Sequence, residues 1–521
     1  MTEKELHRVA QQAINQGDFE RAQHALIPLL NANPNMADGY FLLGIIEAEL
    51  GSFTKATKLI EKACRLHACA EYFAHLAKCY AMLGNSTLTH KAIKSALDCP
   101  HEQALTLDTL GVALSRIGDH KNAIILFERA IALQKTPAFF YNLGSSQTFA
   151  AQFDAARRSY EAAIAMSPLF YQAHSSLSHL GGISPQDNHI ARLLEVDKQL
   201  SHPDAKLHIA HALSREYEAL GEYDKCFQVL ASAKQAKRQK LSYTFSQDKQ
   251  IFDAIRRLDQ ALEAVSNNDE SQAKPVFVVG MPRSGTTLME RVLTNHAETV
   301  AIGERQEFGL AVKAQSGTQT RHVLDIETLA AIASSDYAAI GHAYIENLQK
   351  VVDTTLCFVD KMPLNILYAG LICRSLPHAK IVCMLRNPMD TVWGNYKQLF
   401  SLNDPYYRYA FDQVSTAQYY AEFKSLALYW QERYPRQFFL QSYDDFVQHP
   451  AHFAPKIFDF CGLSFSPSLL DITQNESAVA TASSVQVRSA INAKSLGQWR
   501  RVSKHLSAAL DTFEQLGIEC S

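Results

Sequence analysis

The sequence predicts two kinds of structure in one chain: an α-helical solenoid of repeats, followed by an α/β domain built on a parallel sheet. Small residues recur every 33 or 34 positions through the N-terminal part, which is typical of helix-pair repeats. Short apolar runs alternate with helical stretches in the C-terminal half, which indicates βαβ units. At 521 residues the chain is too long for one ordinary core, so two or more domains are expected.

The repeat is clearest at five small residues that return in register. They are Ala10, Gly44, Ala77, Gly111 and Gly144, which are 34, 33, 34 and 33 positions apart. This period is typical of tetratricopeptide helix pairs, in which small residues let two helices approach closely. The register is lost near residue 169 and returns in the stretch YEALGEYDKCFQVLASAKQA. We expect the repeats to leave a concave face on which a polypeptide docks, with scaffolding inside the protein as the alternative.

The domain boundaries follow from pattern and composition. Residues 1–235 are interpreted as the tetratricopeptide solenoid, 236–273 as a helical connector and linker, and 274–521 as the α/β domain. The connector carries apolar residues at helical spacing from Asp248. The segment SNNDESQA that follows it is polar, so the boundary is placed near residue 270.

Composition and charge describe a soluble globular protein. A net charge of −3 and a pI near 6.7 argue against a nucleic-acid binder with a broad basic surface but allow a local anion pocket. The ten cysteines are scattered without CxxC or metal-ligand spacing, so we expect a cytoplasmic protein without a bound metal. No stretch reaches the ~18 apolar residues of a membrane span, and the N-terminus has no apolar signal region.

The most informative stretch runs KPVFVVGMPRSGTTLMERVL from Lys274. Val276–Val279 is a continuous apolar run that predicts a buried parallel strand. Gly280 and Gly285 bound a tight loop, and a helix is expected to begin at Thr286. Backbone N–H groups converge at such a loop and the helix dipole favours negative charge, so the segment predicts an anion site.

Four side chains in this loop suit a phosphate or sulfate group. Arg283 offers a fixed cation with fork geometry, and Ser284, Thr286 and Thr287 offer hydroxyl donors. The two glycines have the spacing of a Walker A loop, but the lysine that would contact the phosphates of ATP is absent. A P-loop kinase or Mg-ATP hydrolase is therefore disfavoured.

Three later apolar runs predict further strands of the same sheet, at residues 356–360, 380–386 and 438–447. Helical stretches separate these runs, so the sheet is expected to be parallel and to bind its ligands at the carboxyl ends of the strands. The other candidate residues with charged or polar side chains lie mostly at these strand ends.

The segment PRSGTT resembles the 5′-phosphosulfate loop of sulfotransferases, which use 3′-phosphoadenosine-5′-phosphosulfate (PAPS). It is most similar to the tyrosylprotein sulfotransferases and to bacterial proteins that join such a domain to tetratricopeptide repeats. The resemblance covers about half the chain, and nearly all of it with the repeats. It implies a P-loop-like α/β sulfotransferase domain in which residues 283–287 bind the donor, Gly285 included. Animal tyrosylprotein sulfotransferases are membrane-anchored, so this chain departs from them in location.

The resemblance also implies two catalytic residues. Glu304 lies 21 positions after Arg283, where the tyrosylprotein enzymes have their catalytic glutamate. A phenol of pKa about 10 needs such a carboxylate to take its proton during attack. Lys361, 25 positions before Arg386, matches the lysine beside the transferring group. Glu304 could instead neutralise Arg283 or cap a helix, and Glu307 is a substitute candidate.

Three further residues are implied to bind the donor. Arg386 matches the arginine that holds the 3′-phosphate, with a surface salt bridge as the alternative role. Tyr443 matches a tyrosine that lines the nucleotide site, although a core position would also explain it. Ser483 matches a serine of the C-terminal segment that folds over the donor.

The sequence departs from the family pattern at two positions, which puts donor affinity in doubt. Gly394 stands where a serine is expected to contact the same phosphate as Arg386, and Asn395 or Lys397 could compensate. Gln498, directly before the tryptophan, stands where a basic residue is usual. The basic residues that could replace it are Arg488, Lys494, Arg500 and Arg501.

The predicted function is transfer of a sulfuryl group from PAPS to an acceptor hydroxyl, with a protein or peptide tyrosine preferred. A saccharide, a lipid or a small phenol would use the same machinery. Two rivals come from other classes: the P-loop kinase and a catalytically idle adaptor, in which the repeats bind partners and the transferase domain has decayed.

Overall fold

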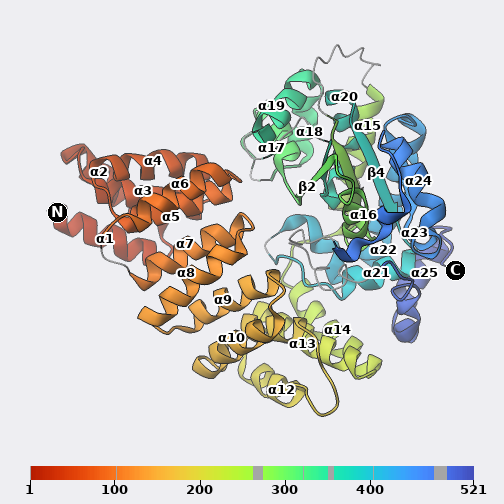
Figure 1. Cartoon of the computed structure of the whole chain (residues 1–521), viewed down its shortest axis with the longest axis horizontal. Helices are drawn as coiled ribbons and strands as arrows, with labels where there is room; N and C mark the ends of the chain where they lie inside the picture. Colours follow the sequence, from red (N-terminus) through yellow and green to blue (C-terminus); the bar gives the residue numbers. More distant parts are fainter. Residues whose placement is uncertain are drawn as a thin grey trace. The chain divides into compact units, whose positions relative to one another are not determined.

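The computed structural model separates into two compact units, Met1–Leu180 and Gly181–Ser521, shown in Figure 1. The residues that the structure describes are 2–100, 103–261, 274–320, 322–349, 352, 357–402, 404–474 and 490–520.

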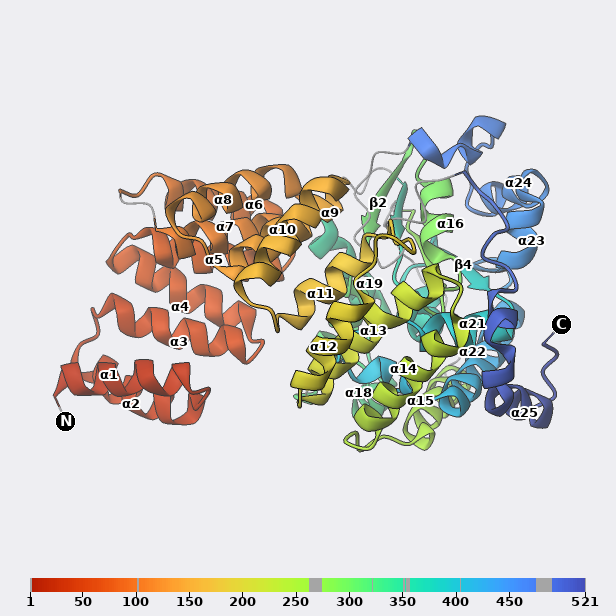
Figure 2. The ribbon, with the colours of Figure 1, turned by 90° about the horizontal axis from the view of Figure 1, so that it is seen from below.

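The first unit consists of helices that follow one another as antiparallel pairs, as Figure 2 shows for α1 to α4. Its helices are α1 (Glu3–Asn15), α2 (Phe19–Ala32), α3 (Ala37–Glu49), α4 (Phe53–Leu66), α5 (Ala70–Met82), α6 (Ser86–Leu97), α7 (Ala104–Arg116), α8 (His120–Leu133), α9 (Pro137–Phe149), α10 (Phe153–Met166) and α11 (Tyr171–His179). The predicted repeat solenoid is therefore confirmed.

The recurring small residues lie where the two helices of a pair touch. A Cβ atom on Gly111 would lie 2.6 Å from the ring of Phe127, and one on Gly144 would lie 2.8 Å from the ring of Tyr160. Each ring belongs to the second helix of the same pair. The repeat period thus reflects a steric requirement, because any larger residue would push the helices apart.

The second unit is built on a sheet that has five parallel strands among the described residues, in the order β2-β3-β1-β4-β5. The strands are β1 (Val276–Gly280), β2 (Thr299–Gly303), β3 (Cys357–Asp360), β4 (Lys380–Leu385) and β5 (Phe438–Ser442). The predicted parallel sheet is confirmed. β2 is not among the predicted strands; it is a short edge strand that is only partly buried. β5 is shorter than the predicted run 438–447, since helix α23 begins at Tyr443.

Helices of this unit precede the sheet as well as alternating with its strands. The helices are α12 (Ile190–Gln199), α13 (Pro203–Ala219), α14 (Tyr223–Arg238), α15 (Phe245–Ala261), α16 (Thr286–Leu293), α17 (Glu307–Ser316), α18 (Ile326–Ile332), α19 (Tyr337–Gln349), α20 (Ala369–Ser375), α21 (Pro388–Tyr396), α22 (Gln413–Arg433), α23 (Tyr443–Gln448), α24 (Pro450–Phe460) and α25 (Ser507–Gln515). The 3₁₀ helices are η1 (Pro363–Tyr368), η2 (Pro405–Phe411), η3 (Pro467–Leu470), η4 (Ile472–Gln474) and η6 (Gln498–His505).

Alternate residues of the central strand β1 face opposite layers of helices. Val278 belongs to a core with Met289 of α16 and Ile457 of α24. The ring of Phe277 packs instead against Phe308 of α17, with centroids 6.0 Å apart. Helices therefore cover both faces of the sheet, which explains why β1 reads as a continuous apolar run.

Helices α12 to α15 belong to the same compact unit as the sheet. Part of this segment was nevertheless predicted from the sequence to be a repeat unit. The division at residues 235 and 273 stays a prediction. α15 covers the described part of the helix expected from Asp248.

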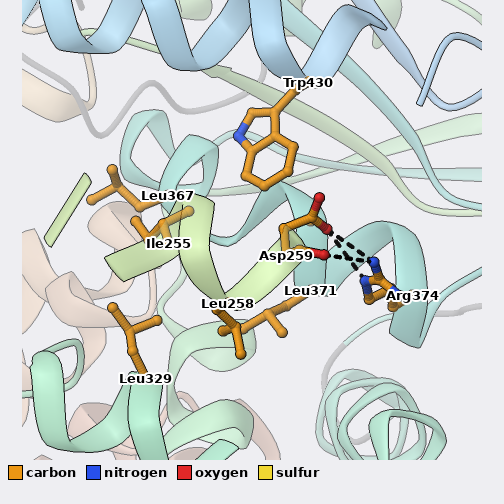
Figure 3. Close-up of a pocket in the computed structure, with 9 residues that line it drawn as sticks. Ile255, Leu258, Asp259, Leu329, Leu367, Leu371, Arg374 and Trp430 are labelled. Atoms are coloured by element: carbon orange, nitrogen blue, oxygen red, sulfur yellow. Dashed lines mark hydrogen bonds and ion pairs between the residues drawn. The ribbon is translucent and has the colours of Figure 1, made fainter. Parts of the chain in front are cut away.

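Helix α15 is held to the sheet domain by a buried ion pair beside a small pocket (Figure 3). Asp259 accepts hydrogen bonds from Arg374 at 3.1 Å and from the Tyr429 hydroxyl at 2.8 Å. Both residues of the ion pair are less than 10% exposed. The pocket lining is otherwise apolar, with Leu258, Leu371 and Trp430 among its residues.

We predict that Asp259→Ala destabilises the second unit by about 3–5 kcal/mol, because it removes the buried carboxylate that pairs with the Arg374 charge. All three tryptophans of the chain lie in this unit, so denaturant unfolding followed by tryptophan fluorescence reports on it alone. Lys249→Ala is the matched control. It removes an ion pair of a half-exposed lysine and should cost no more than about 1 kcal/mol. Equal effects of the two substitutions would contradict a structural role for Asp259.

Candidate active site

The loop between β1 and α16 has a backbone that requires its two glycines. Gly280 and Gly285 have φ angles of +155° and +98°. A Cβ atom on Gly280 would lie 2.8 Å from the carbonyl oxygen of Met384, and one on Gly285 would lie 2.1 Å from the ring of Tyr443. The tight loop predicted from the sequence is confirmed, and its close approach to two neighbouring elements explains the residue type.

Arg283 adopts the left-handed conformation, with φ of +67°, and its surroundings hold it there. Its carbonyl oxygen accepts a hydrogen bond from Arg386 at 3.0 Å. The carbonyl of the preceding residue, Pro282, accepts one from Asn395 at 2.8 Å. A Cβ atom on Gly394 would lie 3.1 Å from that of Arg283. Such conformations persist only where neighbours over-determine them, and they cluster at ligand sites.

Two polar atoms at this loop point to an anionic ligand. The Ser284 hydroxyl and Nε of Arg386 are buried and have no hydrogen-bond partner among the described residues. Ser284 is only 1% exposed. Buried donors without partners are costly, and a phosphate or sulfate oxygen would satisfy both. Thr286 and Thr287, also buried, form the first turn of α16. The residues present therefore fit the donor implied by the sequence.

Arg386 stands at the end of β4 and connects the loop to the C-terminal segment. Besides Arg283, it donates to the carbonyl of Ser495 and lies 4.8 Å from the centre of the Tyr443 ring. Burial, and secondarily the charge of Arg386, lower the pKa of the Arg283 guanidinium to about 10. Two cations held so close are best accommodated when an anion lies between them.

Tyr443 lies against the loop and also reaches the C-terminal segment. Its hydroxyl shares a hydrogen bond of 2.7 Å with the Ser495 hydroxyl. Ser483 lies outside the described residues. Ser495 was not singled out in the sequence analysis, and no signal beyond its place in the segment predicted to cover the donor would have found it. The segment is fastened by Asp390, which accepts from the Gly497 amide at 2.6 Å.

Glu304 and Lys361 come together at the carboxyl ends of the neighbouring strands β2 and β3. The Lys361 ammonium donates to Oε1 of Glu304. Lys361 is fully buried, whereas the Glu304 side chain is 41% exposed. The Glu304 carboxylate is therefore held by the buried ammonium on one side and exposed to solvent on the other. The substitute candidate Glu307 instead forms an ion pair with Arg305 at 2.5 Å.

Glu290 is a further carboxylate at this pair that the sequence analysis missed. It lies on α16 with Oε2 3.9 Å from the Lys361 ammonium. Burial raises the pKa of Glu290 to about 7, an effect that Lys361 opposes and Glu304 reinforces. The available signal was an acidic residue in the stretch LMERVL, where only Glu290 and Arg291 are not apolar. Two carboxylates thus share one ammonium beside the loop.

The two departures from the family pattern have structural counterparts. Asn395, proposed as a phosphate contact, is fully buried and donates to the loop carbonyl of Pro282 instead. Lys397 donates to Glu218 at 2.7 Å and to Gln498 at 3.5 Å. The cation Lys397, which directly follows α21, therefore lies beside the position where a basic residue is usual.

The described parts of the chain contain neither a metal-binding cluster nor a membrane-spanning helix. No group of three or more His, Cys, Asp or Glu side chains is arranged to hold a metal ion there. Likewise, no described helix combines the length and apolar character needed to cross a bilayer.

Comparisons with known proteins identify both parts of the chain. Residues 275–467 match the model of the sulfotransferase family. Residues 10–86 and 104–137 match models of the tetratricopeptide repeat. The chain therefore joins a tetratricopeptide-repeat region to a sulfotransferase domain, as the sequence predicted.

Two relatives share part of their length with this chain. An uncharacterized protein of Aquifex aeolicus (strain VF5) is 26% identical over 315 residues, which cover 58% of this chain and 41% of that protein. A Caenorhabditis briggsae protein, provisionally named a protein-tyrosine sulfotransferase, is 24% identical over 233 residues, covering 43% of this chain and 80% of that protein. The chain thus spans about two fifths of the Aquifex relative.

Solved structures resemble each part separately. The sulfotransferase domain of the curacin biosynthetic pathway is 17% identical, covers 47% of this chain and 98% of its own, and has a TM-score of 0.32. A tetratricopeptide protein of Thermus thermophilus is also 17% identical, covers 34% and 98%, and has the same TM-score.

We predict that Glu290 makes the stability of the second unit depend on pH. Its pKa rises from 4.5 to about 7 on folding, so the folded state holds the proton more tightly. Wild-type stability relative to Glu290→Gln should therefore fall as pH rises from about 4.5 to 7 and stay level above that. Denaturant unfolding at pH 5, 6, 7 and 8 measures this difference, and a difference independent of pH would contradict the raised pKa.

Proposed function

We propose that this protein is a sulfotransferase that moves a sulfuryl group from PAPS to the hydroxyl of a protein or peptide tyrosine. The observation that carries the proposal is the pairing of Glu304 with the buried Lys361 at adjacent strand ends. A loop with unsatisfied polar atoms at Ser284 and Arg386 lies in the same unit. Together they offer an acid–base group and an anion site in one sulfotransferase domain.

The transfer balances without a further reactant. The acceptor oxygen bonds to sulfur while the bond from sulfur to the bridging oxygen of the 5′-phosphate breaks. Glu304 takes the proton of the attacking hydroxyl. Lys361 offsets the charge that develops on the bridging oxygen. The products are a sulfate ester and adenosine 3′,5′-bisphosphate.

The remaining donor contacts follow from the loop and its neighbours. Residues 283–287 would bind the phosphosulfate, with Arg283 and the hydroxyls as donors. Arg386 would bind the 3′-phosphate, with Ser483 as a further donor by resemblance. Tyr443 would line the nucleotide site.

Three observations favour tyrosine as the acceptor. Glu304 has the position of the catalytic glutamate in the tyrosylprotein enzymes, and the C. briggsae relative carries that activity in its name. Tetratricopeptide repeats offer a surface for a polypeptide.

The cytoplasm is proposed as the compartment because the scattered cysteines are all free thiols.

We predict that Glu304→Gln lowers turnover about 10²-fold or more while leaving binding of adenosine 3′,5′-bisphosphate unchanged, because it removes the base but not the donor contacts. Sulfate transfer from labelled PAPS to a tyrosine-rich peptide pool measures turnover. Glu307→Gln is the matched control and should stay close to wild type. Loss of activity in the control alone would assign the base to Glu307 instead.

A ligand test separates the sulfotransferase from its two rivals. We predict that adenosine 3′,5′-bisphosphate at 100 times its dissociation constant stabilises the second unit by about 2.7 kcal/mol. Arg386→Ala should abolish most of this shift. Stabilisation by Mg-ATP instead would favour a kinase. No stabilisation by either nucleotide would favour the non-catalytic adaptor.

A further inference from the structure

The buried ammonium of Lys361 has two carboxylates as neighbours. The residue follows β3 and is 0% exposed, and its backbone N–H donates to the carbonyl of Gly303 at 3.2 Å. Its ammonium donates to Oε1 of Glu304 and lies 3.9 Å from Oε2 of Glu290. Within the described residues, these are the two carboxylates in ion-pair contact with it. A cation removed so completely from water needs an opposite charge beside it.

Glu290 reaches this ammonium from the helix that begins at the candidate donor loop. It lies on α16, four positions after Thr286 and three after Thr287, so it shares a helix face with those two hydroxyls. Only 8% of Glu290 is exposed. The face of α16 that carries the candidate donor contacts therefore continues, one turn later, to Lys361.

The proposed transfer changes the charge of one of the two carboxylates. Glu304 is ionised before the attack and becomes neutral when it takes the proton of the acceptor hydroxyl. The buried Lys361 then loses the charge of its hydrogen-bonded partner. At the same moment the Lys361 cation is needed to offset the charge that develops on the bridging oxygen. Glu290 is the carboxylate that remains in ion-pair contact with it, among the residues that the structure describes.

Electrostatics favour a charged Glu290 at that moment. The charged groups that face it are Lys361 after β3, Glu304 after β2 and Arg291 on α16 itself. Burial raises the pKa of Glu290 to about 7, and the negative Glu304 contributes to the rise. Once Glu304 is protonated, this repulsion ends, so the pKa of Glu290 falls and its ionised form is favoured. Asp360 also interacts with Glu290, but burial raises the pKa of Asp360 to about 8, so Asp360 is mostly neutral at pH 7.

We propose that Glu290 is a positioning residue for sulfuryl transfer, whose carboxylate holds the Lys361 ammonium in place while Glu304 carries the acceptor proton. This inference rests on the proposed function. The proton moves from the acceptor oxygen to Glu304, and Lys361 keeps all of its own protons. Glu290 forms no bond to either substrate and acts through Lys361 alone.

The kinetic test uses the full chain with Glu290→Gln, which keeps the shape of the side chain without its charge. We expect kcat to fall about tenfold at pH 8, while adenosine 3′,5′-bisphosphate binds within about twofold of wild type. Because Glu290 is ionised above its pKa, wild-type kcat should rise between pH 6 and 8, and the variant should lack this rise. Glu290→Asp keeps the charge and should recover part of the rate. Glu298→Gln, at an exposed carboxylate directly before β2, is the control and should match wild type.

A stability test needs neither donor nor acceptor. Glu304→Gln imitates the neutral Glu304 and leaves Lys361 with Glu290 as its carboxylate neighbour. Adding Glu290→Gln to this variant at pH 8 should raise the unfolding equilibrium constant about tenfold more than the same substitution does in wild type. The reason is that the buried ammonium then loses its second carboxylate as well. Denaturant unfolding followed by tryptophan fluorescence measures this excess.

The two tests distinguish failure of the positioning role from failure of the proposed function. Additive effects of the two substitutions on stability would overturn the role of Glu290 alone. So would a Glu290→Gln variant whose kcat keeps the wild-type rise between pH 6 and 8. A wild-type chain that transfers no sulfuryl group, yet shows the excess destabilisation, would overturn the proposed function and keep the contact of Lys361 with two carboxylates.

Discussion

The hydrogen bond from Arg386 to the carbonyl of Arg283 is the contact on which the candidate site depends. It joins the end of β4 to a loop whose backbone is left-handed at a residue other than glycine. The same arginine reaches the Tyr443 ring and the carbonyl of Ser495. Loop, strand end and C-terminal segment are therefore positioned together, and a change at any one of them is expected to alter the geometry of the others.

Charge is distributed unevenly around this contact, and the distribution suits a reaction with an anionic donor. On the loop side, the cations Arg283 and Arg386 are neighbours, and burial together with the Arg386 charge lowers the pKa of Arg283. On the other side, Glu304 and Glu290 share the single ammonium of Lys361. Like charges so placed destabilise the folded protein, and bound phosphate and sulfate groups would offset the cationic side. Stability and ligand binding are thus coupled in this unit.

The two departures from the family pattern acquire a physical meaning only in the folded chain. Gly394 lets the Arg283 side chain pass close to α21, where even a Cβ atom would lie 3.1 Å from it. Gln498 lies within 3.5 Å of the Lys397 ammonium, so a cation stands next to the neutral residue. Neither Gly394 nor Gln498 is therefore evidence that the catalytic domain has decayed.

The sequence by itself determined the repeat period, four of the five strands and the loop, because each depends on local pattern: small residues in register, apolar runs, and glycines at Gly280 and Gly285. It also singled out Glu304, Lys361 and Arg386, through spacing shared with a family. It could not reveal Glu290 or Ser495, whose significance depends on which elements pack together. Only the tertiary structure decided those neighbours, since burial, unpaired charge and contacts between distant helices arise after the chain has folded.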